Sequence, residues 1–261
     1  MRKKITALLL AMGMLLDLGG MSEVVAAEQR TIDNEMQESV AFSTYSYGSG
    51  LKHDPKYANY KKINGIDVSK HQSDIDWEKV KKSGIDFAII RVGNRYGKNG
   101  EIALDPYFKK NIEGATKAGI QVGVYFFTQA VNVTEAMEEA SIAVSLVKDY
   151  PLAYPIFIDT EGAGANARAA NLDVETRTEV CRTFCETVEA AGYNAGVYAS
   201  KNWFNKNLDT SKLSNYYTWL AEYKGEATYE GNYEFWQYTS SGKVDGINGR
   251  VDLNVGYVGF H

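Results

Sequence analysis

The sequence predicts an α/β fold, an irregular (β/α) barrel of the TIM type whose second half is poor in helices. From residue 63 onward, apolar segments of strand length alternate with segments of helical periodicity. Eight candidate strands fall within roughly 200 residues, which suits one small closed barrel. Beyond residue 200 only loops and short turns separate the strands. A doubly wound open sheet is the alternative architecture.

Local signals define the elements in order. The run FAIIRVG at 87–93 is continuously apolar, as in a strand buried on both faces. Asn132, with Glu135 three residues later, is typical of a helix start. The expected strands are 63–69, 87–93, 120–128, 154–161, 193–200, 217–223, 233–239 and 251–255. The expected helices are 76–83, 105–118, 132–149 and 174–191.

The first 62 residues are expected to lie outside the barrel. Residues 1–27 combine a basic start, an apolar stretch and small residues before Glu28, as in a secretory signal. Asp17 leaves an uncleaved anchor as the alternative, but after cleavage we expect no stable membrane association. Residues 28–62 form a polar lead without apolar periodicity. We therefore expect a secreted protein, extracellular or at the cell wall, with its barrel over residues 63–261.

Composition excludes several classes of protein. Hydrophobic residues make up 44% and charged residues 23%, as in soluble globular proteins. The net charge is −5 and no long basic run follows the signal, so nucleic acid is not an expected partner. Three scattered histidines give no metal-ligand spacing, and we expect neither metal nor cofactor. Cys181 and Cys185, four apart on a helix, are expected to be buried free thiols.

Carboxylates fall where the strands of a parallel barrel end, which is where the active sites of such barrels lie. Asp67 ends the first strand, Asp159 and Glu161 the fourth, Glu222 lies near the end of the sixth, and Asp252 lies on the last. Side chains two apart on a strand point the same way, so Asp159 and Glu161 share one space. Repulsion and desolvation raise the pKa of at least one of them, which suits a general acid. The alternative is a pair of capping or loop-anchoring acids.

Aromatic residues near the strand ends are candidates for stacking on sugar rings, although each could equally belong to the core. Carboxylates with aromatics, without metal ligands or a serine nucleophile motif, favour glycoside hydrolysis. Arg91 lies within an apolar strand and needs an acidic partner. It could orient Asp67 or Asp159, or form a purely structural ion pair. The candidate substrate-binding residues are Tyr125, Phe127, Arg91, Tyr198, Trp219, Glu222, Trp236 and Tyr238.

Five short segments, in order, resemble glycoside hydrolase family 25, the N-acetylmuramidases or Chalaropsis-type lysozymes. They are residues 64–69 (NGIDVS) with Gln72, 87–93, 154–161, 236–239 (WQYT) and 251–254 (VDLN). The resemblance implies an irregular barrel that cleaves the β-1,4 bond between N-acetylmuramic acid and N-acetylglucosamine in peptidoglycan glycan strands. It also implies that Glu161 is the general acid and that Asp159, Asp67 and Asp252 complete the catalytic set. We expect the enzyme to be a monomer.

Two other functions remain as alternatives, namely a barrel glycosidase acting on a chitin-type substrate and a non-catalytic barrel that binds the cell wall. The role of Asp159 also has two versions. It could attack the anomeric carbon directly, or it could assist attack by the substrate's own acetamido oxygen. The second version is favoured, because a tethered acetamido group has a high effective concentration near that carbon.

Overall fold

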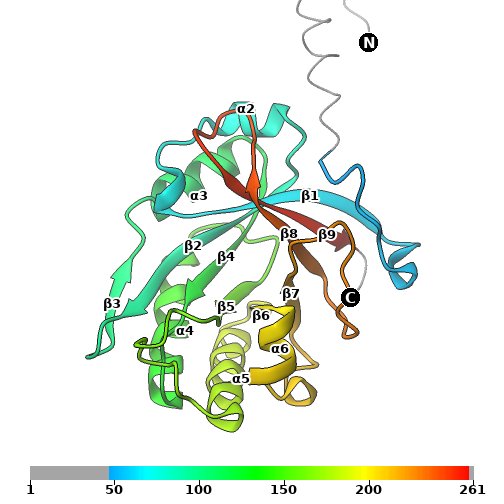
Figure 1. Ribbon diagram of the computed structural model, residues 1–261. Helices are drawn as coiled ribbons and strands as arrows, with labels where there is room; N and C mark the ends of the chain where they lie inside the picture. Colours follow the sequence, from blue (N-terminus) through cyan, green and yellow to red (C-terminus); the bar gives the residue numbers. More distant parts are fainter. Residues whose placement is uncertain (1–46, 259–261) are drawn as a thin grey trace, which may run out of the picture. The chain divides into compact units, whose positions relative to one another are not determined.

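The computed structural model describes residues 47–258, which form a closed barrel of eight strands (Figure 1). The sheet order is β1-β9-β8-β7-β6-β5-β4-β2, and a parallel β1–β2 pairing closes the ring. The strands are β1 (Lys61–Val68), β2 (Phe87–Tyr96), β4 (Gln121–Phe127), β5 (Ile156–Asp159), β6 (Ala195–Ser200), β7 (Tyr217–Ala221), β8 (Phe235–Gly242) and β9 (Val251–Val258). The predicted barrel is confirmed, and the open-sheet alternative is wrong.

One strand runs against the others. β9 is antiparallel to both of its neighbours, β8 and β1, whereas the other strands of the ring run parallel. The expectation of a wholly parallel sheet is therefore wrong at this position. The connection over residues 243–250 is too short for a parallel crossover, so the chain must turn straight back. As a result, the start of β9, not its end, lies at the mouth where the parallel strands finish.

Helices cover only part of the barrel. They are α2 (Trp77–Lys82), α3 (Phe108–Lys117), α4 (Val133–Val147), α5 (Val174–Ala190) and α6 (Lys201–Asn207). Asn132 caps α4 by accepting a hydrogen bond from the Glu135 amide at 3.0 Å. α6 and the short strand β3 (Glu101–Leu104), an antiparallel extension of β2, were not predicted. None of the helices between residues 47 and 258 has the length and apolarity that a membrane-spanning helix requires.

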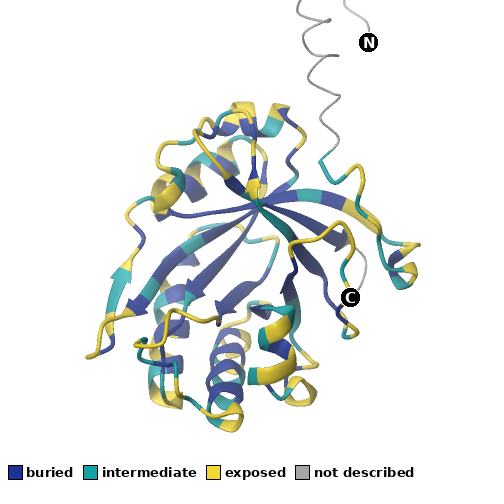
Figure 2. Cartoon of the chain, in the orientation of Figure 1, coloured by how far each residue is buried: buried dark blue, intermediate teal, exposed yellow. Residues whose placement is uncertain are grey.

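The strands separate two apolar cores, and they are the most deeply buried part of the molecule (Figure 2). The outer core lies between strands and helices and includes the free, buried thiols of Cys181 and Cys185, as predicted. The inner core, inside the barrel, is rich in aromatic rings. A Cβ atom on Gly65 would lie 2.2 Å from the ring of Phe87, and one on Gly196 would lie 2.4 Å from Phe157. Glycine at these two positions therefore lets large rings fill the barrel below its mouth.

Residues 47–60 pack against the outside of the barrel, although the sequence placed them in the polar lead. Tyr57 in the 3-10 turn η1 (Pro55–Tyr57) is 0% exposed. Its ring stacks on Tyr257 at 4.0 Å between centroids, and its hydroxyl accepts a hydrogen bond from the Tyr233 amide at 2.8 Å. The folded region thus begins before the predicted boundary at Lys62, because isolated anchoring aromatics leave no periodic signal. The predicted signal, residues 1–27, lies outside the described residues.

We expect Tyr57→Ala to lower the free energy of unfolding by about 3–5 kcal/mol, the usual cost of removing a fully buried aromatic side chain. Urea denaturation followed by tryptophan fluorescence measures the loss. Lys52→Ala is the control, because its ion pair with Glu226 is highly exposed and such pairs contribute little. A Tyr57→Ala variant as stable as the Lys52→Ala control would show that residues 47–60 do not brace the barrel.

Candidate active site

Four carboxylates from three strands meet at the mouth of the barrel. Asp67 lies near the end of β1, and Asp252, at the start of antiparallel β9, is its direct partner in the register. Asp159 is the last residue of β5, and Glu161 follows two positions later. These carboxylates are close enough for their charges to shift one another's pKa values. The charge of Asp252 raises the pKa of Asp67 and of Glu161, and the charges of Asp67 and Glu161 raise that of Asp159. The structure therefore brings all four predicted catalytic carboxylates together.

Asp67 is the most firmly held of the four. Its Oδ2 accepts hydrogen bonds from Gln237 Nε2 and Asn254 Nδ2, both at 2.8 Å. Burial, then the neighbouring charge of Asp252, raise the pKa of Asp67 well above its usual range. Burial also raises the pKa of Asp252 to about 6, while a hydrogen bond from Asp67 and the charge of Arg250 oppose the rise. The buried Asp67–Asp252 pair therefore binds protons more readily than two ordinary aspartates, and a hydrogen bond joins the two carboxyl groups.

Asp159 and Glu161 have contrasting environments. Asp159 is 4% exposed, and its Oδ1 has no hydrogen-bond partner within the described chain. Burial, then the charges of Glu161 and Asp67, raise its pKa well above the ordinary value. Glu161 is open to solvent at one side, yet the surrounding protein and the Asp252 carboxylate raise its pKa as well. The pair thus combines an accessible carboxyl group, Glu161, with a buried one, Asp159, of which one oxygen has no hydrogen-bond partner in the described chain.

Three cavities lie in this region, and catalytic carboxylates line two of them. The largest, about 460 Å³, lies beside Glu161 and is lined by Tyr198 and Glu222 together with residues of α6. A second, about 230 Å³, lies over Asp67 and Asp252 and includes Tyr125 and Arg91. A third, about 290 Å³, has Phe127 in its wall. Phe127 is the register partner of Asp159. The carboxylates therefore have open space on several sides, as a polymeric substrate requires.

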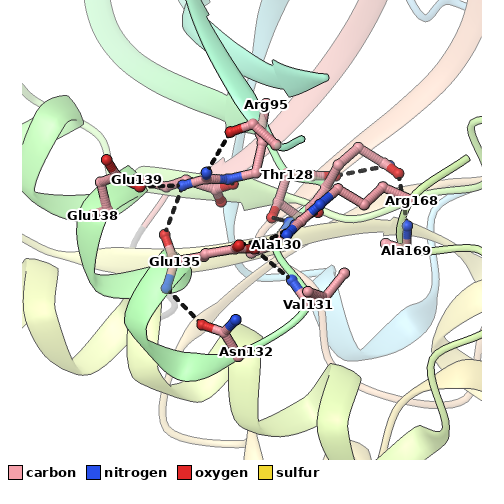
Figure 3. A network of polar contacts seen from close by, with 12 residues as sticks. Arg95, Thr128, Ala130, Val131, Asn132, Glu135, Glu138, Glu139, Arg168 and Ala169 are labelled. Carbon is pink, nitrogen blue, oxygen red and sulfur yellow. Dashed lines mark hydrogen bonds and ion pairs between the residues drawn. The ribbon is translucent and has the colours of Figure 1, made fainter. Parts of the chain in front are cut away.

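A polar network fastens the loop that follows Glu161 (Figure 3). Arg168, at the far end of this loop, binds the carboxylate of Glu135 on α4 and donates to the Gln129 carbonyl at 3.0 Å. Beside it, Arg95 forms ion pairs with Glu138 and Glu139, each at 2.7 Å. Burial, partly opposed by hydrogen bonds from Thr128 and Arg95, raises the pKa of Glu139 to about 7. The network thus anchors the loop after Glu161, which begins with glycine and alanine residues, to α4.

Two predicted sugar-stacking residues, Trp219 and Trp236, are buried, and a third, the half-buried Tyr238, lies on the outer side of the barrel. Trp219 lies in the inner core below the site, where its Nε1 donates to Asn254 Oδ1 at 2.8 Å. Trp236 is 0% exposed and belongs to the outer core, and Tyr238 packs against its ring. Side chains alternate along β8, so Gln237 points into the mouth while its two neighbours point outward. The expectation that Trp236 and Tyr238 line the site is therefore wrong.

Arg91 and Glu222 have partners that the sequence did not reveal. Both Nε and Nη2 of Arg91 donate to Asp105 Oδ2 at 2.7 Å, so its partner is neither Asp67 nor Asp159. Its charge nevertheless opposes, in part, the rise in the pKa of Asp159 that burial and the neighbouring carboxylates cause. Glu222 accepts hydrogen bonds from the amide and the hydroxyl of Thr228 at 2.8 and 2.6 Å. Burial alone would raise the pKa of Glu222, but these bonds outweigh it and lower the pKa, so the carboxylate fastens the β7–β8 loop.

Sequence reasoning assigned no role to Gln237, Asn254 and Tyr223. Gln237 and Asn254 occur in two of the segments that resemble the family, 236–239 and 251–254. Gln237 lies two positions after Phe235, and Asn254 two positions after Asp252, so each shares a strand face with that residue. That alternation could have placed both at the mouth. Tyr223, in the loop after β7, gave no periodic signal. Among residues 47–258, no group of three or more His, Cys, Asp or Glu side chains is arranged to hold a metal ion.

Comparison with known proteins identifies related chains. The family model "Glycosyl hydrolases family 25" matches residues 66–247. Uncharacterized protein YegX of Escherichia coli O157:H7 is 29% identical, over 97% of this chain and 90% of its own. The autolytic lysozyme of Clostridium acetobutylicum is 27% identical, over 74% of this chain and 55% of its own. The autolysin LytC of Streptococcus pneumoniae, solved with a synthetic peptidoglycan ligand, superposes with a TM-score of 0.66 at 31% identity. That alignment covers 75% of this chain and 47% of LytC, so this chain spans about half the length of the autolysin.

We expect Asp67→Asn to stabilise the fold increasingly as the pH rises from about 4. The raised pKa keeps a proton on Asp67 in the folded state, whereas the unfolded chain releases it, so the wild type loses stability with rising pH. The asparagine amide can accept from Gln237 and donate to Asp252 as the protonated acid does, but it has no proton to lose. The difference in the free energy of unfolding should grow by up to about 1.4 kcal/mol per pH unit.

Thermal unfolding at several pH values measures this difference. Asp74→Asn is the matched control, because Asp74 is exposed, pairs with Lys110 and does not line the cavity over Asp67. A gain for Asp67→Asn that does not change with pH would contradict a buried, proton-bearing Asp67.

Proposed function

The chain belongs to glycosyl hydrolases family 25 and is a glycoside hydrolase of the lysozyme kind. From this premise we propose that it cleaves the β-1,4 bond between N-acetylmuramic acid and N-acetylglucosamine in peptidoglycan. The observation that carries the proposal is the contrast between Glu161, accessible in a cavity, and Asp159, buried beside it with an unpaired oxygen. The peptidoglycan ligand of the related LytC structure supports the substrate class.

Glu161 is the general acid in this proposal. Its raised pKa keeps a proton on an exposed carboxyl group closer to neutral pH than an ordinary glutamate would. The proton passes to the glycosidic oxygen as the bond from that oxygen to the anomeric carbon breaks. The resulting Glu161 carboxylate then takes a proton from the water that completes hydrolysis. Asp252 contributes through its negative charge, which favours the protonated form of Glu161.

Asp159 assists a nucleophile that the substrate supplies. Its unpaired Oδ1 is placed to accept a hydrogen bond from the N–H of a 2-acetamido group. The acetamido carbonyl oxygen attacks the anomeric carbon and forms a cyclic oxazolinium ion, whose positive charge the Asp159 carboxylate offsets. Water then opens this ring and restores the acetamido group. In this role Asp159 acts as an anion; burial and the charges of Glu161 and Asp67 raise its pKa, and the charge of Arg91 partly opposes that rise.

Secretion is part of the proposal. The segment 1–27 carries the three-part pattern of an export signal, and peptidoglycan lies outside the cytoplasmic membrane. We propose that the enzyme acts as a monomer at the cell wall.

A chitin-type glycosidase is the second candidate, because the same carboxylates could act on any sugar with a 2-acetamido group. Mass spectrometry of products from purified peptidoglycan separates the two functions. New reducing ends on muramic acid are expected. Reducing ends on glucosamine, or cleavage of chitin oligomers alone, would refute the muramidase assignment.

We expect Glu161→Gln to reduce turnover of peptidoglycan by roughly 10²- to 10⁴-fold, because the amide cannot protonate the leaving oxygen. An aryl glycoside whose phenol leaves without protonation should lose far less activity. Glu189→Gln, an exposed glutamate at the opposite end of α5, is the control. An equal loss on both substrates would remove Glu161 from the acid role.

We expect Asp159→Asn to lose rate on substrates that carry the acetamido group, because the oxazolinium ion loses its counter-charge. A thiazoline analogue of the intermediate should inhibit the wild type and bind the variant more weakly. Peptide mass spectrometry after treatment with a 2-fluoro glycoside tests the alternative. A glycosyl ester trapped on Asp159 would establish direct attack and contradict the assisted mechanism.

A further inference from the structure

Glu161 lies at a point where the backbone has little support of its own. β5 ends at Asp159, and the Thr160 amide makes the last backbone hydrogen bond before the loop, to the Tyr198 carbonyl at 3.0 Å. Among residues 47–258, no hydrogen-bond partner holds the backbone of residues 161–163. The direction of the Glu161 carboxyl group therefore depends on the contacts that its neighbours make.

Trp203 on α6 contacts the residue on each side of Glu161. Its Nε1 donates to Thr160 Oγ1 at 3.2 Å. Its ring lies beside Gly162, where an added Cβ atom would be 3.5 Å from the Trp203 Cζ3 atom. The indole packs against the outer core and lines none of the three cavities at the mouth. Any influence of Trp203 on the reaction therefore passes through Glu161.

Trp203 is itself held at two places. Its amide donates to Oγ of Ser200, the N-cap of α6, at 3.2 Å. The guanidinium of Arg177 on α5 lies 4.7 Å from the centroid of the indole, where α5 and α6 lie side by side (Figure 1). Arg177 is 4% exposed and donates to the carbonyls of Ala169 and Leu172 at 3.0 and 3.2 Å. A desolvated cation binds an aromatic face more strongly than an exposed one, so the indole has little freedom to move.

The loop after Glu161 is thus held near its beginning by Trp203 and near its end by Arg177. Its first residues, Gly162, Ala163 and Gly164, have no side chain that could form a hydrogen bond. Proton transfer requires the carboxyl group within about 2.6–3.2 Å of the leaving oxygen. Because a misplacement of about 1 Å can cost roughly 10²-fold in rate, a small movement of residues 160–162 is enough to impair the acid.

We propose that Trp203 is a positioning residue for the general acid, because its N–H and its ring hold Thr160 and Gly162 and so fix the direction of the Glu161 carboxyl group. The inference rests on the proposed function, in which Glu161 protonates the leaving oxygen. It adds to that function a residue that touches neither the substrate nor the reacting atoms.

Trp203→Phe tests the proposal, because it keeps an aromatic ring beside Gly162 and Arg177 but removes the N–H. On soluble peptidoglycan fragments, kcat should fall about tenfold with KM within about twofold. On the aryl glycoside whose phenol leaves without protonation, kcat should fall by less than about twofold. Thr160→Val removes the same hydrogen bond from its other end. The double variant should therefore lose little more activity than either single variant, since all three lack one and the same contact.

The pH dependence of kcat/KM gives a readout that a loss of packing alone would not move. A freer Glu161 carboxyl group is better solvated, so its pKa falls from the raised value toward that of an ordinary glutamate. The acid then loses its proton earlier, and the alkaline limb of the profile moves to lower pH. Neither substitution changes a charge around Glu161, where Asp159 on β5, Asp252 on β9, Tyr198, Tyr223 and the cavity residues Lys201, Glu222 and Lys224 all remain.

Phe204→Leu is the matched control, because Phe204 follows Trp203 on α6 but packs on Tyr229, with 5.4 Å between ring centroids. It should lower the melting temperature without changing the alkaline limb or the ratio of kcat on the two substrates. An unchanged limb and an unchanged ratio in Trp203→Phe and Thr160→Val would overturn the inference, whatever their melting temperatures. Failure of the proposed function is distinct, because Glu161→Gln itself would then lose activity equally on both substrates, or the wild type would not cleave the fragments.

Discussion

Gathering four carboxylates in one barrel mouth creates a repulsion that the surrounding structure must offset. Part of the relief comes from a hydrogen bond between Asp67 and Asp252, whose strands pair directly and whose pKa values burial raises. Further relief comes from the amides of Gln237 and Asn254, which donate to the same oxygen of Asp67. The negative charge of Asp252 also acts on Glu161, whose pKa it raises in addition to the effect of burial. The state of the accessible acid thus depends on a buried pair that never touches it through a hydrogen bond in the described structure.

The aromatic inner core supports this arrangement. Trp219 and Tyr198 fill the barrel with their rings, and each directs its one polar atom upward to an amide that holds Asp67. Aliphatic residues could fill the same space, but they could not fix the amide orientations of Asn254 and Gln237. Packing below the site and electrostatics within it are therefore carried by the same side chains. The outer polar network of Arg95 and Arg168 has a separate task, since it anchors the loop after Glu161 to α4.

The sequence predicted those parts of the site that depend on local periodicity. Asp159 and Glu161 were found because a strand repeats every two residues, and Asp67 because it ends an apolar run. Asp252 was noted as a carboxylate on the last strand and joined the catalytic set through the family resemblance, while the direction of its strand was mistaken. Alternation along β8 puts Trp236 and Gln237 on opposite faces, but the sequence interpretation chose Trp236 and Tyr238 for the site and so assigned the wrong face of β8 to the mouth. Nor was the partner of Arg91, because Asp105 lies beyond an unforeseen hairpin. Tyr57 was missed because a single anchoring ring leaves no pattern.

The pairing of β1 with β9 also determines when the site comes into being. Asp67 and the Asn254 amide that holds it are separated by 187 positions in the chain, so nearly the whole domain must be made before they meet. Contacts of such long sequence separation form late, after local helices and neighbouring strands. A chain that stops short of β9 has an open seam between β1 and β8, and it lacks both Asp252 and Asn254. We therefore expect partly made or C-terminally clipped chains to lack both the closed ring and the Asp252 charge that contributes to the raised pKa of Glu161.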